Sequence, residues 1–277
     1  QDIYWHDPET LFISLHQDGR TLYPGSGFPD EAGGPNAPGR TVNIPLPPGT
    51  GEEGFLHTLE ELVMPLLERF EPEIIINSAG QDNHFSDPIT NMNFSARGYA
   101  ALNSRLKPDI AVLEGGYAVE TALPYTNVGI IMAMAGMDTS HVKEPDYDKQ
   151  CRPQSPETTA YLHQLIRQLK QIYFESWNVE DDNPEGRIIE RSREIFYDTD
   201  MIRERQKERL RRCRRCAGTL AIESASSLGS SIMGVSIPKN ACPACSRTGR
   251  QWFEEAAKGR FDHVYLQDRD RGAYETI

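Results

Sequence analysis

The chain has 277 residues, a net charge of −12 at pH 7 and an isoelectric point near 5.1. It is long enough for one sizeable core and a small second module. The acidic balance argues against a general nucleic-acid binder, because neutralising phosphates requires a basic surface. Lys and Arg do gather in residues 203–215, but we interpret this run as a solvated helix face, and no nucleic-acid partner is expected.

Membrane and targeting segments are not expected either. No run reaches the roughly 18 apolar residues that a membrane span needs. The longest run, Val128 to Met137, is interpreted as a buried helix of the core. The first residues lack the basic start and the apolar stretch of a signal peptide. Four of the five cysteines form Cys-x-x-Cys pairs, which is typical of metal ligation in a reducing compartment and predicts a cytoplasmic protein.

Residues 1–150 are predicted to form an α/β domain half in which short strands alternate with helices, as in a parallel sheet covered on both faces. The strands are expected at 10–17, 41–44, 73–77 and 109–114, and the helices at 52–70, 93–106 and 125–137. Pro65 should kink or break the first of these helices. The Gly- and Pro-rich stretch 24–39 should be a long loop.

The composition of the chain changes after Gly136. Residues 138–155 are predicted to be a linker or surface excursion, and two long helices are expected at 155–177 and 186–212. The predicted domains are therefore a half-domain at 1–150, a helical connector at 151–205 and a cysteine module at 206–277.

Two loops that follow buried strands carry the chemistry, Ser78-Ala79-Gly80-Gln81-Asp82-Asn83-His84 and Leu113-Glu114-Gly115-Gly116-Tyr117. Ligands of open α/β sheets bind beyond the carboxyl ends of the strands, so the two loops can converge. Together with Ser14-Leu15-His16 and Tyr23-Pro24-Gly25-Ser26-Gly27, they resemble the histone deacetylase family, including acetylpolyamine and acetoin-utilisation relatives. The resemblance covers about residues 1–140 and only the second half of that catalytic domain, an arginase/deacetylase-like fold.

The resemblance implies a role for each motif residue. Asp82 matches the second aspartate that binds the catalytic zinc, and Tyr117 matches the tyrosine that donates a hydrogen bond to the developing oxyanion. Gly115 and Gly116 would let the backbone approach the substrate closely. Gln81 and Asn83 depart from the family pattern and should change the polarity beside Asp82.

Further positions match supporting roles. They are His84 and Asp87, which would buttress the loop; Ser14 and Leu15, which would bind a monovalent cation such as K⁺; and Tyr23 and Ile89, which would line the acyl-lysine channel. For His84 a structural hydrogen-bonding role is favoured over metal ligation. Without the resemblance, these positions would be interpreted as ordinary strand, turn and core residues.

The first half of such a domain supplies tandem histidines and an Asp-x-His pair of metal ligands. None of the seven histidines forms a His-His pair, and one aspartate cannot hold catalytic zinc, which needs three protein ligands. The other half is then a separate polypeptide, or the chain is a fragment or a processed product, or it is a non-catalytic remnant. We favour a split or processed enzyme, whose partner would be the histidine-bearing half.

The cysteine module contains Cys213-x-x-Cys216 and Cys242-x-x-Cys245, the spacing of a four-cysteine structural zinc site of the zinc-ribbon type. Redox and iron–sulfur roles are less favoured alternatives. Ribbon strands are expected at 218–222 and 232–237. Arg212, Arg214 and Arg215 should offset the charge of the thiolates, and Cys151 should be an ordinary thiol.

The sequence therefore predicts a zinc-dependent hydrolase that removes an acetyl or similar acyl group from an amine such as acetyl-lysine or an acetylpolyamine. It would hold one catalytic zinc, shared with the missing half, and one structural zinc. The alternative is a non-catalytic interaction or scaffold subunit that docks a partner through the ribbon and its basic helix.

Overall fold

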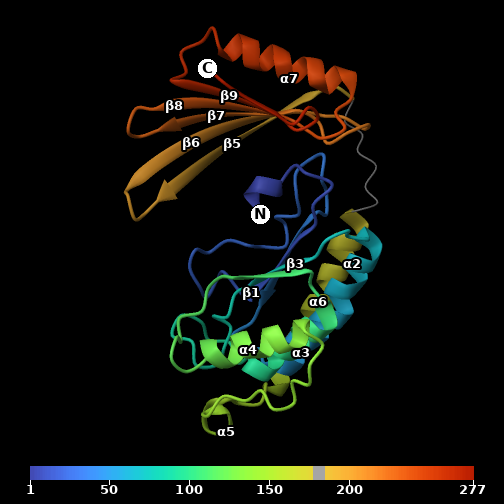
Figure 1. The fold of residues 1–277 in the computed structure, drawn as a ribbon, viewed down its shortest axis with the longest axis vertical. Helices are drawn as coiled ribbons and strands as arrows, with labels where there is room; N and C mark the ends of the chain where they lie inside the picture. The colour runs from blue at the N-terminus through green and yellow to red at the C-terminus, as the bar shows by residue number, and fades with distance from the viewer. Residues whose placement is uncertain (177–184) are drawn as a thin grey trace. The chain divides into compact units, whose positions relative to one another are not determined.

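The computed structural model describes residues 1–176 and 185–277, and the chain packs as two units (Figure 1). The α/β unit comprises Leu11–Ala32 and Thr41–Asn178. The sheet unit comprises Gln1–Thr10, Gly33–Arg40 and Val179–Ile277. The domain limits that the sequence predicts, near residues 150 and 205, stay predictions.

Two pairs of parallel strands form the framework of the α/β unit. Strand β1 (Phe12–Gln17) pairs with β2 (Thr41–Leu46), and β3 (Ile76–Ala79) pairs with β4 (Ile110–Leu113). Helices α3 (Ala96–Leu106) and α4 (Leu123–Met134) follow β3 and β4 along the chain. The predicted α/β class with parallel pairing is therefore confirmed, although β3 begins later than expected.

The helix predicted at 52–70 consists of three joined segments. They are α1 (Glu52–Thr58), a π-helical stretch η2 (Leu59–Val63) and α2 (Met64–Phe70). The break lies directly before Pro65, which has no N–H to donate and whose ring crowds the carbonyl four residues earlier. A π-helical stretch accommodates that defect without ending the helix, so the irregularity predicted at Pro65 is observed as a change of helix type.

The core of the α/β unit forms where these helices meet β2 and the long helix α6 (Pro156–Ser176). Every residue of β2 is buried. Tyr173 of α6 is fully buried, and its hydroxyl donates to the carbonyl of Asn43 at 2.8 Å and accepts from the Asn43 N–H at 2.7 Å. The short helix α5 (Tyr147–Gln150) lies in the excursion before α6.

The prediction that residues 128–137 form a buried helix is wrong for this structure. Helix α4 exposes Val128, Ile131 and Met134, and Met137 beyond its end is 59% exposed. The neighbouring strands are open too, with Ile76 61% and Leu113 71% exposed. A helix and a strand pair this apolar need an apolar surface against them, and the described residues do not supply one on this side.

A six-stranded sheet and one helix make up most of the sheet unit (Figure 1). The strand order is β10-β9-β8-β7-β6-β5, antiparallel except for the β8–β9 pair. The bounds are β5 (Ile188–Tyr197), β6 (Ile202–Arg211), β7 (Leu220–Ser226), β8 (Ser231–Ile237), β9 (His263–Asp268) and β10 (Ala273–Thr276). Helix α7 (Pro243–Ala256) makes the crossover between β8 and β9, as parallel pairing requires, and packs Trp252 and Phe253 on the sheet.

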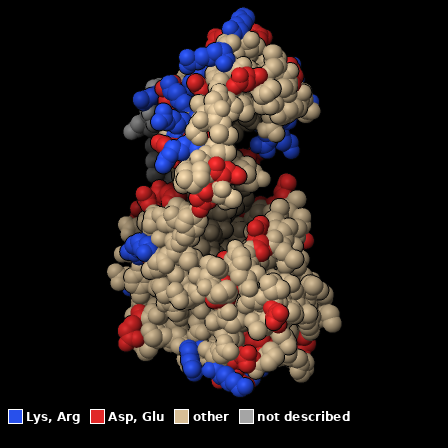
Figure 2. Space-filling view, turned by 90° about the vertical axis from the view of Figure 1, so that its left-hand side faces the viewer, with Lys and Arg blue, Asp and Glu red and all other residues tan. Residues whose placement is uncertain are grey.

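The prediction of a charged helix at 186–212 is wrong, because these residues form the hairpin β5–β6. Cations occupy every second position of β6 from Arg203 to Arg211, while the alternate positions face the other side of the sheet. Charges pair across the hairpin, with Lys207 3.1 Å from Glu190 and Arg203 3.5 Å from Glu194. Lys and Arg side chains accordingly gather mainly on this unit in Figure 2.

The opposite face of the hairpin carries the N-terminal segment, which includes the short 3-10 helix η1 (Asp2–Tyr4). His6 Nε2 lies 3.3 Å from a carboxylate oxygen of the buried Glu208, and the Arg191 guanidinium stacks over Trp5. Residues 1–10 are thus an integral part of the sheet unit. Within the described part of the chain, no helix has the length and apolar character to cross a membrane.

Candidate active site and metal centre

The two motif loops lie side by side because their strands pair in parallel. Strands β3 and β4 end at Ala79 and Leu113, which are partners in the register. Directly beyond them, the Gln81 N–H donates to the Gly115 carbonyl at 2.5 Å. The side chain of Gln81 is buried and donates to Asn127 Oδ1 of α4. The convergence that the sequence predicts is therefore observed, and Gln81 joins the loops to the helix.

Asp82 is half-buried, and the backbone of the second loop lies very close to it. A Cβ on Gly115 would come within 2.9 Å of Asp82 Oδ2, so any other residue there would displace the carboxylate. Gly116 has a φ of +148°, and a Cβ there would crowd Leu123 and Gln81. Burial, reinforced by the nearby Asp87, raises the pKa of Asp82 above its ordinary value.

Asp87 connects the two loops. It is 7% exposed, its Oδ2 accepts from the Tyr117 N–H at 2.7 Å, and its Oδ1 accepts from the Ile89 N–H at 2.9 Å. Charge-assisted bonds of this kind are stronger than neutral ones. The Tyr117 and Ile89 side chains themselves are 55% and 50% exposed. The structure thus brings Asp82, Asp87 and the Tyr117 backbone together, while the catalytic roles stay predictions.

His84 is buried and uses both ring nitrogens within the fold. Its Nδ1 accepts from the Ser86 N–H at 3.2 Å, so Nε2 carries the proton and donates to Glu144 Oε1 at 2.9 Å. Burial raises the pKa of Glu144, but the bonds from His84 and from the Ala96 backbone outweigh it and leave the pKa lowered. This arrangement supports a structural hydrogen-bonding role for His84 over metal ligation.

The sequence predicts that Glu144 lies in a surface excursion, and its burial against His84 was not predicted. It is 2% exposed and joins the Asp82 loop to the start of α3. The contact spans 60 residues of sequence, and no local pattern marks it.

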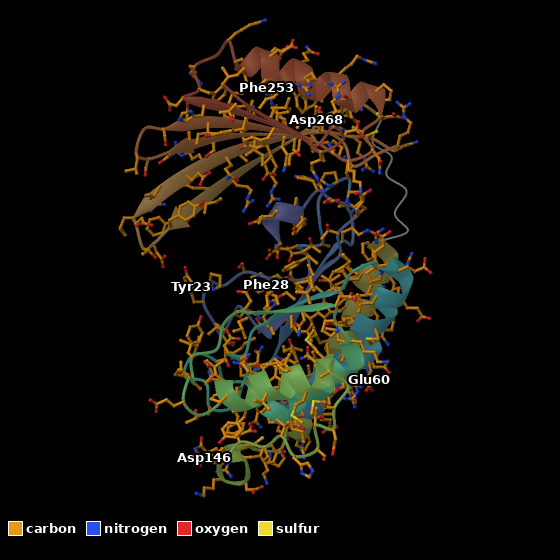
Figure 3. All side chains as sticks on the ribbon, in the orientation of Figure 1. Tyr23, Phe28, Glu60, Asp146, Phe253 and Asp268 are labelled. Atoms are coloured by element: carbon orange, nitrogen blue, oxygen red, sulfur yellow. The ribbon has the colours of Figure 1, made fainter. Side chains whose placement is uncertain are left out.

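The predicted cation residues and the channel residue Tyr23 lie on and after β1. Ser14 Oγ lies 2.9 Å from His16 Nδ1, and His16 Nε2 lies 3.0 Å from the Gly27 carbonyl oxygen. Burial lowers the pKa of His16. Leu15 is half-buried in β1, whereas Tyr23 is 78% exposed at the outer side of its loop (Figure 3). Cation binding by Ser14 and Leu15 and a channel role for Tyr23 stay predictions.

The four paired cysteines form one compact cluster. Cys213 and Cys216 lie in the turn after β6, Cys242 is the N-cap of α7, and Cys245 lies in its first turn. Their sulfur atoms lie within 4.8 Å of one another, with Cys213 3.7 Å from Cys242 and 3.6 Å from Cys216. Zinc–sulfur bonds of 2.3 Å in a tetrahedron separate the sulfurs by about 3.8 Å, so the donor set fits zinc. In residues 1–176 and 185–277 it is the only cluster of three or more potential metal ligands.

The arginines around the cluster differ in part from the prediction. Arg211, which the sequence analysis did not single out, donates to Cys245 Sγ at 3.2 Å. The negative charge of Cys242 raises the pKa of Arg215, as expected for a cation that offsets thiolates. Arg212 instead donates to Asn36 Oδ1 at 2.6 Å and to the Pro35 carbonyl. The predicted ribbon strands correspond to β7 and β8, within a larger sheet.

Comparison with known proteins extends the resemblance. The sequence profile of the histone deacetylase domain matches residues 1–128. A probable deacetylase of Archaeoglobus fulgidus is 52% identical over 155 residues, which are 53% of this chain and 43% of that protein. Residues 1–128 are therefore similar in sequence to the histone deacetylase domain. The acetoin utilization protein AcuC of Bacillus subtilis is 30% identical over 165 residues, 54% of this chain and 42% of AcuC.

Solved histone deacetylase structures have a similar fold. The histone deacetylase Clr3 has a TM-score of 0.55 at 25% identity, over 67% of this chain and 32% of Clr3. The HD domain of HDA15 has a TM-score of 0.54 at 25% identity, over 64% of this chain and 47% of that domain. The predicted resemblance to histone deacetylases and the predicted fold class are confirmed, and the chain spans less than half the length of these relatives.

Proposed function

We propose that this chain is part of a metal-dependent hydrolase that removes an acetyl or similar acyl group from an amine. One observation carries the proposal: Asp82 and the Tyr117 loop lie on adjacent strand ends, joined by Asp87 and separated only by the glycine Gly115. Relatives of the matched segment include two probable deacetylases, which supports acyl-amine hydrolysis as the reaction class.

Within this proposal, each residue of the site has a distinct task. Asp82 is one of three protein ligands of a divalent ion, and zinc suits a carboxylate oxygen combined with histidine nitrogens. That ion, when bound, would polarise the amide carbonyl and the attacking water. The Tyr117 hydroxyl donates a hydrogen bond to the oxyanion, which is worth a few kcal/mol of barrier in comparable sites. Asp87 holds the Tyr117 backbone in position.

The remaining ligands and the general base would come from a polypeptide segment with the tandem histidines and the first Asp-x-His pair. The open apolar face of α4, β3 and β4 supports this partner, because such a face gains stability when it is covered. The net charge of −12 favours a substrate that keeps positive charge beside the acylated nitrogen, such as an acetylpolyamine. The cysteine cluster would hold a structural zinc, and Ser14 with Leu15 a monovalent cation, in a cytoplasmic protein.

Reconstitution tests the proposal. Residues 1–277 alone should bind one zinc per chain, at the cysteines, and should not hydrolyse acetylated lysine or polyamine. Adding the histidine-bearing segment should restore a second zinc and hydrolysis, and Asp82→Ala should remove both while the cysteine-bound zinc remains. A reconstituted complex with one zinc and no hydrolysis would refute the enzyme and favour the scaffold alternative. Hydrolysis by the chain alone would refute the need for the second segment.

A further inference from the structure

Part of the long loop of the deacetylase segment is built into the sheet unit. The loop begins after β1 with Tyr23 in the α/β unit, while Gly33–Arg40 belongs to the sheet unit. Backbone bonds fix the shape of this second part: the Gly34 N–H donates to the Trp5 carbonyl at 2.6 Å, and the Ala37 N–H donates to the Gly34 carbonyl at 2.8 Å. Ala37 is 1% exposed. The segment is therefore a packed element of the cysteine-bearing unit.

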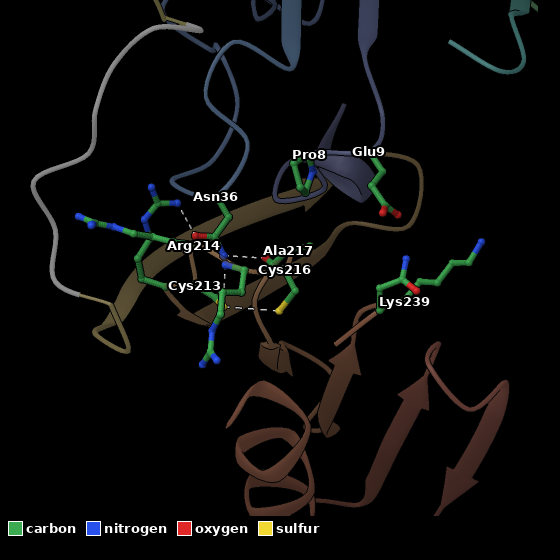
Figure 4. A pocket seen from close by; sticks show the side chains of 11 residues that line it. Pro8, Glu9, Asn36, Cys213, Arg214, Cys216, Ala217 and Lys239 are labelled. Carbon is green, nitrogen blue, oxygen red and sulfur yellow. Dashed lines mark hydrogen bonds between the residues drawn. The ribbon is translucent and has the colours of Figure 1, made fainter. Parts of the chain in front are cut away.

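Asn36 connects this segment to the turn that carries Cys213 and Cys216. Its Nδ2 donates to the Ala217 carbonyl at 2.6 Å, directly after Cys216, and its Oδ1 accepts from Arg212 at 2.6 Å, directly before Cys213 (Figure 4). Asn36 is 8% exposed. Buried hydrogen bonds of this kind are costly to remove, because their partners are left without water.

Contacts with Cys245 hold the turn that carries Cys213 and Cys216. Arg211 donates to Cys245 Sγ at 3.2 Å, and the Thr219 hydroxyl donates to the Cys245 carbonyl at 2.7 Å. Gly218, between them, has a φ of +79°, and a Cβ there would collide with the Asn36 amide. The same turn thus contacts the cysteines on one side and Asn36 on the other.

We propose that the four-cysteine site is a metal-dependent clamp on residues 33–40, and that Asn36 is the positioning residue through which it acts. Metal binding by the cysteines fixes the turn, because four thiolates within 4.8 Å of one another repel each other unless a metal binds them. The turn then fixes Asn36 and the end of the loop whose beginning carries Tyr23. The consequence for the substrate channel rests on the proposed function, whereas the hold on the loop does not.

Hydrogen exchange on the full chain tests the clamp without any activity. In Asn36→Ala the zinc content should stay that of the wild type, while a peptide spanning 33–40 exchanges about tenfold faster, since the bonds to Ala217 and Arg212 are lost. Removing zinc from the wild type with a chelator should accelerate exchange of the same peptide to the same extent. In Asn36→Ala, removing zinc should accelerate exchange little further. Lys239→Ala, an exposed residue of the same cavity of about 820 Å³, is the matched control and should exchange as the wild type does.

Kinetics of the reconstituted enzyme test the effect on the channel. Asn36→Ala should raise KM for the acetylated amine several-fold and leave kcat within a factor of about two, because the reacting groups are untouched. Asn36→Asp keeps an acceptor for Arg212, so its KM should lie between those of the wild type and Asn36→Ala. Unchanged exchange in Asn36→Ala, or after zinc removal, overturns the clamp. Faster exchange with unchanged KM overturns its link to the channel, and an inactive reconstituted wild type refutes the proposed function alone.

Discussion

Asp87→Asn is the most direct test of how the two motif loops are joined. The substitution keeps the size of the side chain but replaces one carboxylate oxygen by an NH₂ group. Either Tyr117 or Ile89 then loses its acceptor, and two donors face each other in a site that is only 7% exposed. The negative charge that Asp87 places near Asp82 disappears at the same time.

The expected cost follows from these contacts. A hydrogen bond to a charged group contributes roughly 1.5–3 kcal/mol, and a buried donor without an acceptor adds to that, so we expect a loss of about 3 kcal/mol. For a unit of this size, such a loss lowers the midpoint of thermal unfolding by about 6–12 °C. In the reconstituted enzyme, kcat should fall by about 10–100-fold, since a small displacement of a positioned group is enough for that.

Thermal unfolding followed by circular dichroism measures the first effect, and Asp138→Asn is the matched control. Asp138 also accepts from a backbone N–H two residues on, at 2.9 Å, but its side chain is 71% exposed. Its substitution should cost less than about 0.5 kcal/mol. If Asp87→Asn unfolds at the wild-type temperature, the inferred link between the loops is wrong. If stability falls but kcat does not, Asp87 supports the fold without positioning Tyr117.

Four further outcomes are expected. Tyr117→Phe in the reconstituted enzyme should lower kcat by about 10²-fold with unchanged metal content, because the phenol stabilises charge without ligating; full activity would remove Tyr117 from the mechanism. Gly115→Ala should weaken the second zinc in a metal titration, since its Cβ would press on Asp82 at 2.9 Å, whereas Gly80→Ala, with an ordinary 3.5 Å contact, should not. The pKa of Asp82 is raised in the folded chain, so its contribution to stability is present at low pH and is lost as the pH rises through that folded pKa. Urea unfolding of the metal-free chain across this range should therefore be flatter with pH in Asp82→Asn, and identical profiles would contradict the shift. Cys242→Ser should release zinc and unfold the sheet unit, as measured by zinc content and circular dichroism, and retention of zinc would contradict the cysteine site.

Local patterns in the sequence were sufficient for most strands and helices of the α/β unit. The runs that became β1 and β2 are short, apolar and bounded by Gly or Pro, so the strand assignment had few competitors. Parallel pairing of β3 and β4 followed from the helix between them, and it places the Asp82 and Tyr117 loops side by side. The position of Pro65 predicted the irregularity of the helix, seen as the π-helical stretch η2, for a local reason too.

Features that depend on distant contacts escaped prediction. Glu144 and Asn36 are polar residues in irregular segments, and only the folded chain shows that they are buried against His84 and Arg212. The prediction for the segment that forms the hairpin β5–β6 was wrong for a different reason. Its dense charge suggested a solvated helix, although the alternation of cations from Arg203 to Arg211 has the period of a strand. Period outweighs composition in such a segment.

The two neighbouring carboxylates of the site differ in how their charge is stabilised. Asp87 accepts two backbone N–H groups at 2.7 and 2.9 Å. Asp82 is half-buried beside it, and apart from its own backbone N–H, the residues that the structure describes offer its side chain no donor, so burial and repulsion raise its pKa. Gly115 keeps the space in front of Oδ2 free of a side chain. A carboxylate that is costly to ionise and has few hydrogen-bond donors gains most from a bound cation. The energetics of Asp82 therefore argue for a ligand role independently of the sequence resemblance.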